Sequence, residues 1–252
     1  MKKTLIALMA LAGIASAADL VAEWNGFTSL ESGNYTFTIS GNTTVDSNGT
    51  LNVVGTPGGS AYIDITTAGL SLENGFTLNM LVNNVGGYGQ NTPFAFVGLR
   101  GETTSYLATA GITSDKTGGF CLNGSGSKIA ITRPNNNSIQ AVEDTSTFSA
   151  ITLTFTDDEF KMYLNGELVA TGTPNSGQMT TAMAQETITK IALGSWAEAN
   201  SKSTLNEHVA SFAIYNGAMS AAEVKAMLVP EPTTATLSLL ALAGLAARRR
   251  RK

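Results

Sequence analysis

The chain has 252 residues, 13% of them charged, with one cysteine and one histidine, and its formal net charge is −4. This composition excludes a disulfide framework, a multi-cysteine zinc site and paired-histidine metal motifs, and we expect no metal or cofactor. The two ends carry seven basic residues, so residues 4–247 hold eight basic and 19 acidic side chains, a net charge of −11. An acidic body repels phosphate backbones, which argues against nucleic acid as a partner.

Residues 1–17 have the pattern of a secretory signal peptide. Lys2 and Lys3 form a basic start, residues 5–11 are apolar, and Ala15-Ser16-Ala17 supplies the small residues that a signal peptidase requires. We expect cleavage after Ala17 or, as an alternative, after Ala18. A short buried helix is the competing interpretation of this segment.

The body, residues 18–229, is predicted to consist of short β-strands joined by turns. Six Asn-Gly pairs punctuate it, and such pairs favour the positive φ angles of tight turns; they begin at Asn25, Asn48, Asn74, Asn123, Asn165 and Asn216. Apolar and polar residues alternate in 35–39 and in 151–156, which is the signature of strands with one buried face. Trp24 lies in an early strand and is expected in the core.

The clearest hairpin is predicted around Leu164-Asn165-Gly166-Glu167, after a turn at Asp157-Asp158. Many short strands without a long repeat or a Pro/Ser-rich linker indicate one sandwich or barrel domain over residues 18–229. A single helix is predicted from Ala221 to Leu228. Ser220 and Glu223 form its capping box, and Met219 and Val224 form a hydrophobic staple.

Candidate catalytic and metal-binding residues are few. Asp157 and Glu159 have the i, i+2 spacing of paired carboxylates, but we expect them in an exposed turn. His208 is the only histidine that could act as a base, with Ser211 nearby in sequence, and a hydrogen-bonded or exposed position at a strand start is expected instead. Cys121 is expected to be buried. The loop that begins at Asp46 lacks the remaining oxygen ligands of a calcium site, so it is expected to be a turn.

Two aromatic residues lie in polar loops that could bind a sugar. Trp196 follows the predicted strand 188–193, and Tyr88 lies in a Gly/Asn-rich segment. Exposed loops often carry binding sites, and an aromatic ring can stack on a sugar face. The competing interpretation is that each ring packs over the edge of the sandwich.

Two segments resemble the LamG-like, concanavalin A-type jelly-roll domains of bacterial surface proteins. Residues 151–171 resemble the family's hairpin ending in Y-x-N-G-x-L/V, and residues 212–227 resemble its closing strand and short helix. The resemblance implies an all-β, two-sheet antiparallel jelly-roll sandwich. Many relatives carry Gly and Asp just before the closing strand, where this chain has Glu207 and Ala210. This difference puts any calcium or turn role of that Asp in doubt, and no E-x-D-x-x-E strand typical of laminarinase-like enzymes occurs here.

The C-terminal segment, residues 230–252, has three parts in order. These are Pro230-Glu231-Pro232, an apolar run over residues 233–247, and the basic end formed by Arg248, Arg249, Arg250, Arg251 and Lys252. As a helix the apolar run would reach about 22 Å, short of a hydrocarbon core of roughly 30 Å, a gap that snorkelling arginines and local thinning reduce. The basic cluster would remain cytoplasmic, which places the body on the outer side, as the signal peptide requires. A helix docked on the body is the alternative.

This tail resembles the PEP-CTERM sorting signal of Gram-negative bacteria. The resemblance implies recognition by an exosortase-type processing enzyme, membrane anchoring through residues 233–247 before processing, and delivery to the cell surface, often together with exopolysaccharide. The sequence therefore predicts a cell-surface or extracellular-matrix protein with a non-catalytic LamG-like module that binds glycan. Two alternatives remain open: a structural surface protein with no specific ligand, and an unrecognised glycoside hydrolase.

Overall fold

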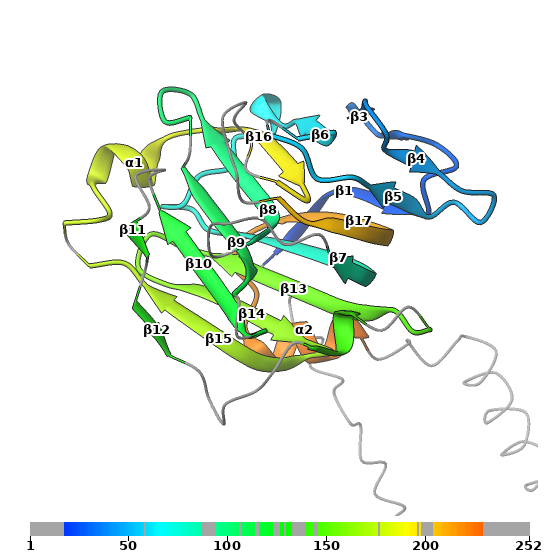
Figure 1. Cartoon of the computed structure of the whole chain (residues 1–252). Helices are drawn as coiled ribbons and strands as arrows, with labels where there is room; N and C mark the ends of the chain where they lie inside the picture. Colours follow the sequence, from blue (N-terminus) through cyan, green and yellow to red (C-terminus); the bar gives the residue numbers. More distant parts are fainter. Residues whose placement is uncertain are drawn as a thin grey trace, which may run out of the picture.

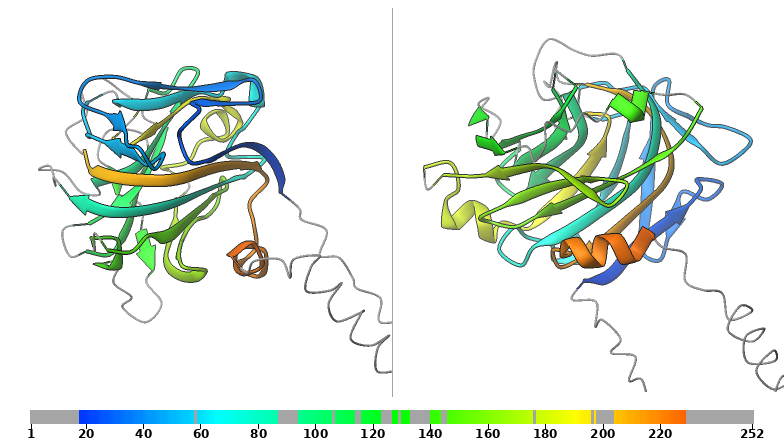
Figure 2. Two further views of the ribbon diagram at one scale, coloured as in Figure 1. Left: turned by 90° about the vertical axis from the view of Figure 1, so that its right-hand side faces the viewer. Right: turned by 90° about the horizontal axis from the view of Figure 1, so that it is seen from below.

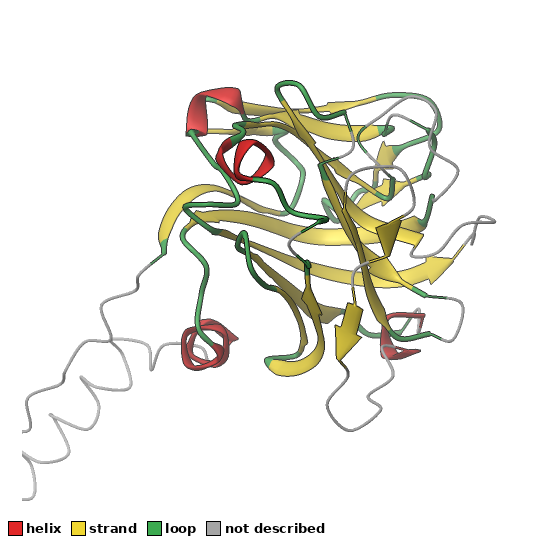
Figure 3. Ribbon diagram, turned by 90° about the vertical axis from the view of Figure 1, so that its left-hand side faces the viewer, coloured by secondary structure: helices red, strands yellow, loops and turns green. Residues whose placement is uncertain are grey.

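A computed structural model shows two antiparallel β-sheets packed face to face, with short helices at the periphery (Figures 1 and 3). The structure describes residues 18–57, 59–86, 94–105, 107–113, 116–122, 127–128, 130–132, 140–143, 146–175, 177–195, 197 and 204–228. The prediction of a two-sheet antiparallel sandwich followed by a short helix is confirmed within these residues.

The larger sheet has nine strands. In spatial order they are β12 (Ala130–Thr132), β15 (Glu167–Thr173), β14 (Phe160–Leu164), β13 (Ser149–Phe155), β7 (Phe76–Gly86), β17 (Asn206–Asn216), β5 (Leu51–Val53) and β4 (Thr44–Val45), and β1 (Asp19–Asn25) pairs with β17 beyond β5. The long strand β17 lies at the centre of this sheet. β7 pairs with one edge of β17, and β5 and β1 pair with successive parts of its other edge.

The second sheet has eight strands. In spatial order they are β11 (Ser127–Lys128), β10 (Gly118–Leu122), β9 (Ala108–Ile112), β8 (Phe94–Gly101), β16 (Ile188–Leu193), β6 (Ala61–Asp64), β3 (Tyr35–Ile39) and β2 (Glu31–Ser32). The predicted strands 35–39 and 188–193 are both observed. Strands that are distant in sequence, such as β8 and β16, are neighbours in this sheet. The alternation of apolar and polar residues does not predict which strands pair.

The core lies between the two sheets and is rich in aromatic rings. Trp24 is buried as predicted, its indole N–H donates to the Leu30 carbonyl at 3.0 Å, and its ring meets Phe37 edge-on at 4.7 Å. Phe155 stacks on Phe76 with ring centroids 5.0 Å apart. Offset and edge-to-face ring pairs of this kind stabilise a core beyond the burial of their area.

The hairpin predicted at Asn165-Gly166 is confirmed. Both residues have positive φ, 49° and 81°, as a two-residue type I′ turn between β14 and β15 requires. Among the other described Asn-Gly pairs, only the glycine has a positive φ. The Asn-Gly pattern therefore marks turns of more than one kind, and the type I′ geometry is limited to the 164–167 hairpin within the described residues.

The helix α2 (Ala221–Leu228) has the predicted bounds and cap. The Ser220 N–H donates to the Glu223 carboxylate at 2.7 Å, and the Glu223 N–H donates back to the Ser220 hydroxyl at 3.3 Å. The sequence analysis missed a second helix, α1 (Thr181–Gln185), and the two 3-10 turns η1 (Thr66–Ala68) and η3 (Gln140–Glu143). The α1 cap is Thr180, whose hydroxyl accepts from the Met183 N–H.

One expectation for β13 is wrong in part. Its apolar face was predicted to be buried and its threonine face exposed, but Thr152 and Thr154 are also buried. α2 lies across the outer face of the larger sheet, as the right-hand view of Figure 2 shows. Tyr163, Met219 and Val224 form a small apolar cluster there, so a helix distant in sequence covers the face that alternation marks as exposed.

The predicted signal peptide and the C-terminal tail lie outside the described residues. Within the described part of the chain, none of the helices combines the length and the apolar character needed to span a bilayer.

Candidate functional site

The described ends of three connections of the sandwich lie at one edge of the molecule. The connections link β5 to β6, β7 to β8, and β16 to β17, and their described ends include Gly55, Gly86, Gly194 and Leu205. Gly86, at the end of β7, is the register partner of Asn206, at the start of β17. The Leu205 N–H donates to the Gly194 carbonyl at 2.7 Å, so the third connection is closed at its base.

The backbones at this edge approach one another closely. The Gly55 N–H donates to the Asn206 side-chain oxygen at 3.1 Å, and a Cβ at position 55 would overlap the carbonyl oxygens of Leu205 and Gly194. The Gly194 N–H donates to the Phe96 carbonyl at 2.9 Å, which ties this edge to β8. The described ends of these connections are thus fixed relative to one another by backbone hydrogen bonds and by the Asn206 side chain.

A row of polar side chains crosses the larger sheet beside this edge. His208 is the register partner of Asn83 on β7 and of Asn52 on β5, and the Asn84 amide nitrogen lies 3.2 Å from the His208 Nε2. The β7–β17 register shifts between His208 and Asn206, and Asn84 has a φ of 49°. The side chains of Val82 and Val85 are part of the core between the sheets. The bulge therefore places Asn83 and Asn84, which lie between these valines in the sequence, on the outer face of the larger sheet.

An exposed aromatic residue lies at the same level of the sheet. Phe148 is 42% exposed, and it immediately precedes Ser149, which pairs with Val82. Phe148 therefore lies near the level of Asn83, next to the row of amides. The sequence analysis missed Phe148 and the asparagines; the available signal was the adjacent polar pair Asn83-Asn84, which breaks the alternation of β7.

A buried carboxyl group lies behind this polar row. Glu207 points toward the core with a relative exposure of 0%, and neither of its carboxyl oxygens has a hydrogen-bond partner among the described residues. Burial raises the pKa of Glu207 well above its ordinary value, and the Gly194 backbone N–H offsets only part of this shift.

A second buried carboxyl group, Glu186, lies elsewhere, just after α1. The backbone N–H groups of Thr103 and Thr104 both donate to its Oε1, the latter at 2.6 Å. Burial acts to raise the pKa of Glu186, but the hydrogen bonds from Thr104 and Thr103 outweigh it, so the pKa lies below its ordinary value. Glu186 fastens the turn after β8 to the end of α1.

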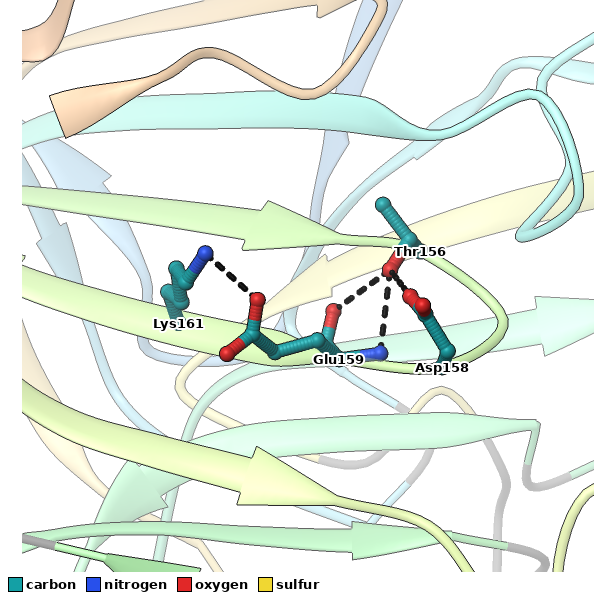
Figure 4. Close-up of polar contacts among 4 residues, drawn as sticks. All are labelled: Thr156, Asp158, Glu159 and Lys161. Carbon is teal, nitrogen blue, oxygen red and sulfur yellow. Dashed lines mark hydrogen bonds and ion pairs between the residues drawn. The ribbon is translucent and has the colours of Figure 1, made fainter.

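The carboxylate pair considered for catalysis lies in a tight turn, as predicted. Asp157 is exposed between β13 and β14, and Glu159 forms an ion pair with Lys161 at 2.5 Å. The Thr156 hydroxyl donates to Asp158 and accepts from the Glu159 N–H, so the turn is held by its own side chains (Figure 4). These contacts are those of a structural turn.

The other candidates occupy the positions expected for them. Cys121 is buried in β10, and His208 contacts Asn84 near the start of β17. The Asp46 side chain accepts from the N–H groups of Asn48 and Thr50, which makes the loop a turn. Among the described residues no cluster of three or more His, Cys, Asp or Glu side chains is placed to hold a metal ion.

The predicted ligand-binding residues Trp196 and Tyr88 lie outside the described residues, as do the tail residues from Pro230 onward. The described residues on either side show where their segments begin and end. Tyr88 belongs to the connection that leaves Gly86, and Trp196 belongs to the connection closed by Gly194 and Leu205. The two segments therefore start from neighbouring positions of the same edge.

Two stacked antiparallel sheets of this size, with the β-strand order described above, define a lectin-type jelly-roll sandwich. A family model for the concanavalin A-like lectin/glucanases superfamily, of the laminin G type, matches residues 57–225. The chain belongs to this superfamily. A second family model matches residues 228–252 as a PEP-CTERM protein-sorting motif, which confirms the resemblance of the tail. No curated protein matches the sequence significantly.

Several solved structures share the fold at low sequence identity. The binding domain of botulinum neurotoxin DC, in complex with rat synaptotagmin II, is 12% identical with a TM-score of 0.55, over 83% of this chain and 51% of that chain. The same toxin domain in complex with SialylT is 14% identical with a TM-score of 0.54, over 84% and 50%. Trypanosoma rangeli sialidase, with 2,3-difluorosialic acid, is 15% identical with a TM-score of 0.60, over 85% and 33%.

This chain spans about half the length of the toxin domains and about one third of the sialidase. At these identities the likeness shows the fold alone. The sorting motif implies export, exosortase processing and a surface location.

Proposed function

We propose that this chain is an exported surface protein whose body, residues 18–229, binds a neutral glycan at the edge where the described ends of the three connections lie. The observation that carries the proposal is that the described ends of the Tyr88 and Trp196 segments are neighbours, beside the side chains of Asn84 and His208. Asn83, at the same level, is buried. Amide and imidazole groups donate to and accept from sugar hydroxyls, and aromatic rings stack on the C–H face of a sugar. Phe148 offers a further exposed ring at the same level.

Charge supports a neutral rather than an acidic glycan. The segment between the two basic ends carries a net charge of −11, which disfavours polyanions. Stacking on one exposed ring contributes on the order of 1 kcal/mol, so single-site binding is weak. Many copies at the cell surface then supply avidity.

The environments of three carboxyl groups favour a binding module over a hydrolase. A retaining glycosidase needs two carboxyl groups about 5–5.5 Å apart at an accessible site. Glu207 is sealed in the core, Glu186 is engaged by Thr103 and Thr104, and Glu159 pairs with Lys161.

We propose further that the protein carries a cleaved signal peptide over residues 1–17 and a processed tail over residues 230–252. In this scheme residues 233–247 anchor the precursor in the membrane and Arg248 to Arg251 remain cytoplasmic, until an exosortase releases the body to the surface or the extracellular matrix. The body then contacts exopolysaccharide or another glycan there.

The test is retention of the purified protein on neutral polysaccharide columns, compared for the parent, Trp196→Ala, Tyr88→Ala and Phe148→Ala. We expect Trp196→Ala to weaken binding most, by about fivefold for one site, which corresponds to about 1 kcal/mol. Leu20→Ala is the control, because Leu20 is 55% exposed on β1 and pairs with Tyr215, at the far end of β17 from the site.

If the parent protein binds no polysaccharide, the structural-protein alternative replaces this proposal. Equal retention of the parent and all three aromatic variants would move the site elsewhere on the body. Release of reducing sugars that depends on Asp157 or Glu159 would instead support the hydrolase alternative.

A further inference from the structure

Helix α2 is attached to the body through an apolar cluster of its own. Val224 is fully buried, and it packs with Met219 from the preceding turn and Tyr163 from β14. This cluster is separate from the main core between the sheets. Loss of the α2 contacts would therefore leave the inter-sheet core intact.

The far end of α2 lies against the β14–β15 hairpin. The Leu228 Cδ1 is 3.2 Å from the position that a Cβ would occupy on Gly166, and Lys225 forms an ion pair with Glu167 at 2.8 Å. The sorting motif begins at residue 228, which is also the last residue of the helix. Pro230 follows two residues later, so the Pro-Glu-Pro segment starts at most about 7 Å along the chain from the folded surface.

The start of the body belongs to the same cluster. Ala18, the first residue after the predicted signal-peptide cleavage point, is buried with Val224 and Met219. β1 begins and α2 ends on the same side of the molecule (Figure 2). A membrane-bound enzyme that handles the tail must therefore work next to this crowded surface.

We propose that α2 is a releasable spacer, which holds the sorting motif against the body while it is docked and presents the motif to the processing enzyme when it detaches. As a helix its eight residues span about 12 Å, whereas extended they span about 27 Å. When α2 detaches and unfolds, its length therefore more than doubles, and the start of the motif moves away from the surface of the body. This inference rests on the sorting motif and is independent of glycan binding.

The composition of α2 suits a reversible attachment. A helix of eight residues is marginal on its own, so its docking contacts maintain it. Within α2 only Val224 is fully buried, whereas Ala221, Ala222, Lys225 and Ala226 are exposed. Segments with few buried apolar contacts open locally at low free-energy cost, without global unfolding.

The experiment compares tail removal from the full-length protein in a host that carries an exosortase, by pulse-chase and mass spectrometry. Val224→Asp places a charge in the buried cluster and should detach α2. Ala222→Asp adds the same charge at an exposed position of the same helix and is the matched control. A third variant inserts a flexible Gly/Ser linker of about ten residues after Leu228 and leaves α2 unchanged.

We expect Val224→Asp and the linker variant to be processed about threefold faster or more, and Ala222→Asp to be processed like the parent. In the isolated protein, Val224→Asp should also increase proteolytic cleavage within residues 218–228, with an unchanged main unfolding transition. Equal processing of the parent and the linker variant would overturn the proposal. Slower processing of a folded Val224→Asp would overturn it too, since docking would then be required. Should Val224→Asp fail to fold, the linker variant decides.

Discussion

Glu186 and Glu207 are two carboxyl groups with little exposed surface whose pKa values shift in opposite directions. Glu186 is 8% exposed and Glu207 is 0% exposed. Thr103 and Thr104 donate to Glu186, whose pKa lies below its ordinary value despite burial. Glu207 has only the Gly194 N–H to offset its burial, and burial holds its pKa well above the ordinary value.

The comparison shows that hydrogen-bond donors and depth of burial together set the direction in which a buried carboxyl pKa moves. Thr104 and Thr103 lower the pKa of Glu186 through side-chain and backbone hydrogen bonds, and Glu186 stabilises the turn that supplies them. Glu207 lies deeper and has fewer donors, so its pKa is raised and its burial costs stability. Glu207 lies behind the Asn83–His208 row, so this unfavourable burial destabilises the fold next to the edge where we propose that glycan binds.

The largest expected effect follows from removing the Glu186 carboxylate. Glu186→Ala leaves the Thr103 and Thr104 N–H groups without their acceptor, and hydrogen bonds to charged groups contribute about 1.5–3 kcal/mol each. We expect the free energy of unfolding at pH 7 to fall by about 3 kcal/mol, measured by denaturant titration. A loss below about 1 kcal/mol would show that the two hydrogen bonds are not stabilising.

Removal of the Glu207 carboxyl group should have the opposite sign. Glu207→Leu replaces an unpartnered buried polar group with an apolar side chain of similar length, which should increase the free energy of unfolding at pH 7 by about 1–3 kcal/mol. The same titration measures it. Glu207→Ala is the control, because the cavity that it leaves should remove most of this gain. A destabilised Glu207→Leu would mean that the carboxyl group has a partner.

The pH dependence should separate the two residues. Above pH 4.5 the unfolded chain ionises Glu207 while the folded chain keeps it protonated, so stability falls as the pH rises toward the raised folded pKa. The limit for one group is about 1.4 kcal/mol per pH unit. Glu207→Gln should abolish this fall, as denaturant titrations between pH 5 and pH 9 would show. Parallel curves for parent and variant would contradict the assignment.

Glu186 should act on the acidic side. Its folded pKa is lowered, so its contribution is present above pH 4.5 and is lost as the pH falls through the folded value. Glu186→Gln should therefore differ most from the parent at neutral pH and least in acid, the reverse of Glu207→Gln. The same titrations, extended below pH 4.5, measure this difference.

The smallest effect is expected for a carboxylate at the surface. Glu159 pairs with Lys161 at 2.5 Å, but the two side chains are 38% and 33% exposed, so water screens the pair. We expect Glu159→Gln to reduce the free energy of unfolding by at most about 0.5 kcal/mol. A larger loss in the same denaturant assay would show that the turn drawn in Figure 4 depends on this ion pair.

Local features of the fold could be predicted because neighbouring residues determine them. Asn165 and Gly166 tolerate positive φ, which specifies their turn, and Ser220 and Glu223 cap α2 within one helical turn. Alternation placed Ile151 and Leu153 in the core. It could not show that Thr152 and Thr154 are buried as well, because Tyr163, the register partner of Thr152, packs with Met219 and Val224, which come much later in the chain.

For the candidate site, the sequence supplied candidate residues but not their arrangement. Trp196 and Tyr88 were selected as aromatic residues in polar loops, His208 was noted as the single histidine, and the turn role of Asp157 and Glu159 followed from the hairpin pattern. The neighbouring origin of the Tyr88 and Trp196 segments depends on the pairing of Gly86 with Asn206, which are 120 positions apart. The Asn83–Asn84 bulge was hidden as well, because a register shift becomes visible only once the partner strand is known.

The sequence by itself determined the sorting motif, the sandwich class, the main hairpin and the capped helix, because motifs, turns and caps are encoded over a few adjacent residues. The tertiary structure alone decided which strands are neighbours and in which direction the pKa of each buried carboxyl group shifts. Nothing near Glu186 or Glu207 in the sequence distinguishes them. Thr103 and Thr104 come to Glu186 from a turn more than eighty residues away, and no such pair of donors reaches Glu207 among the described residues. Long-range hydrogen bonds of this kind exist only after the chain has folded.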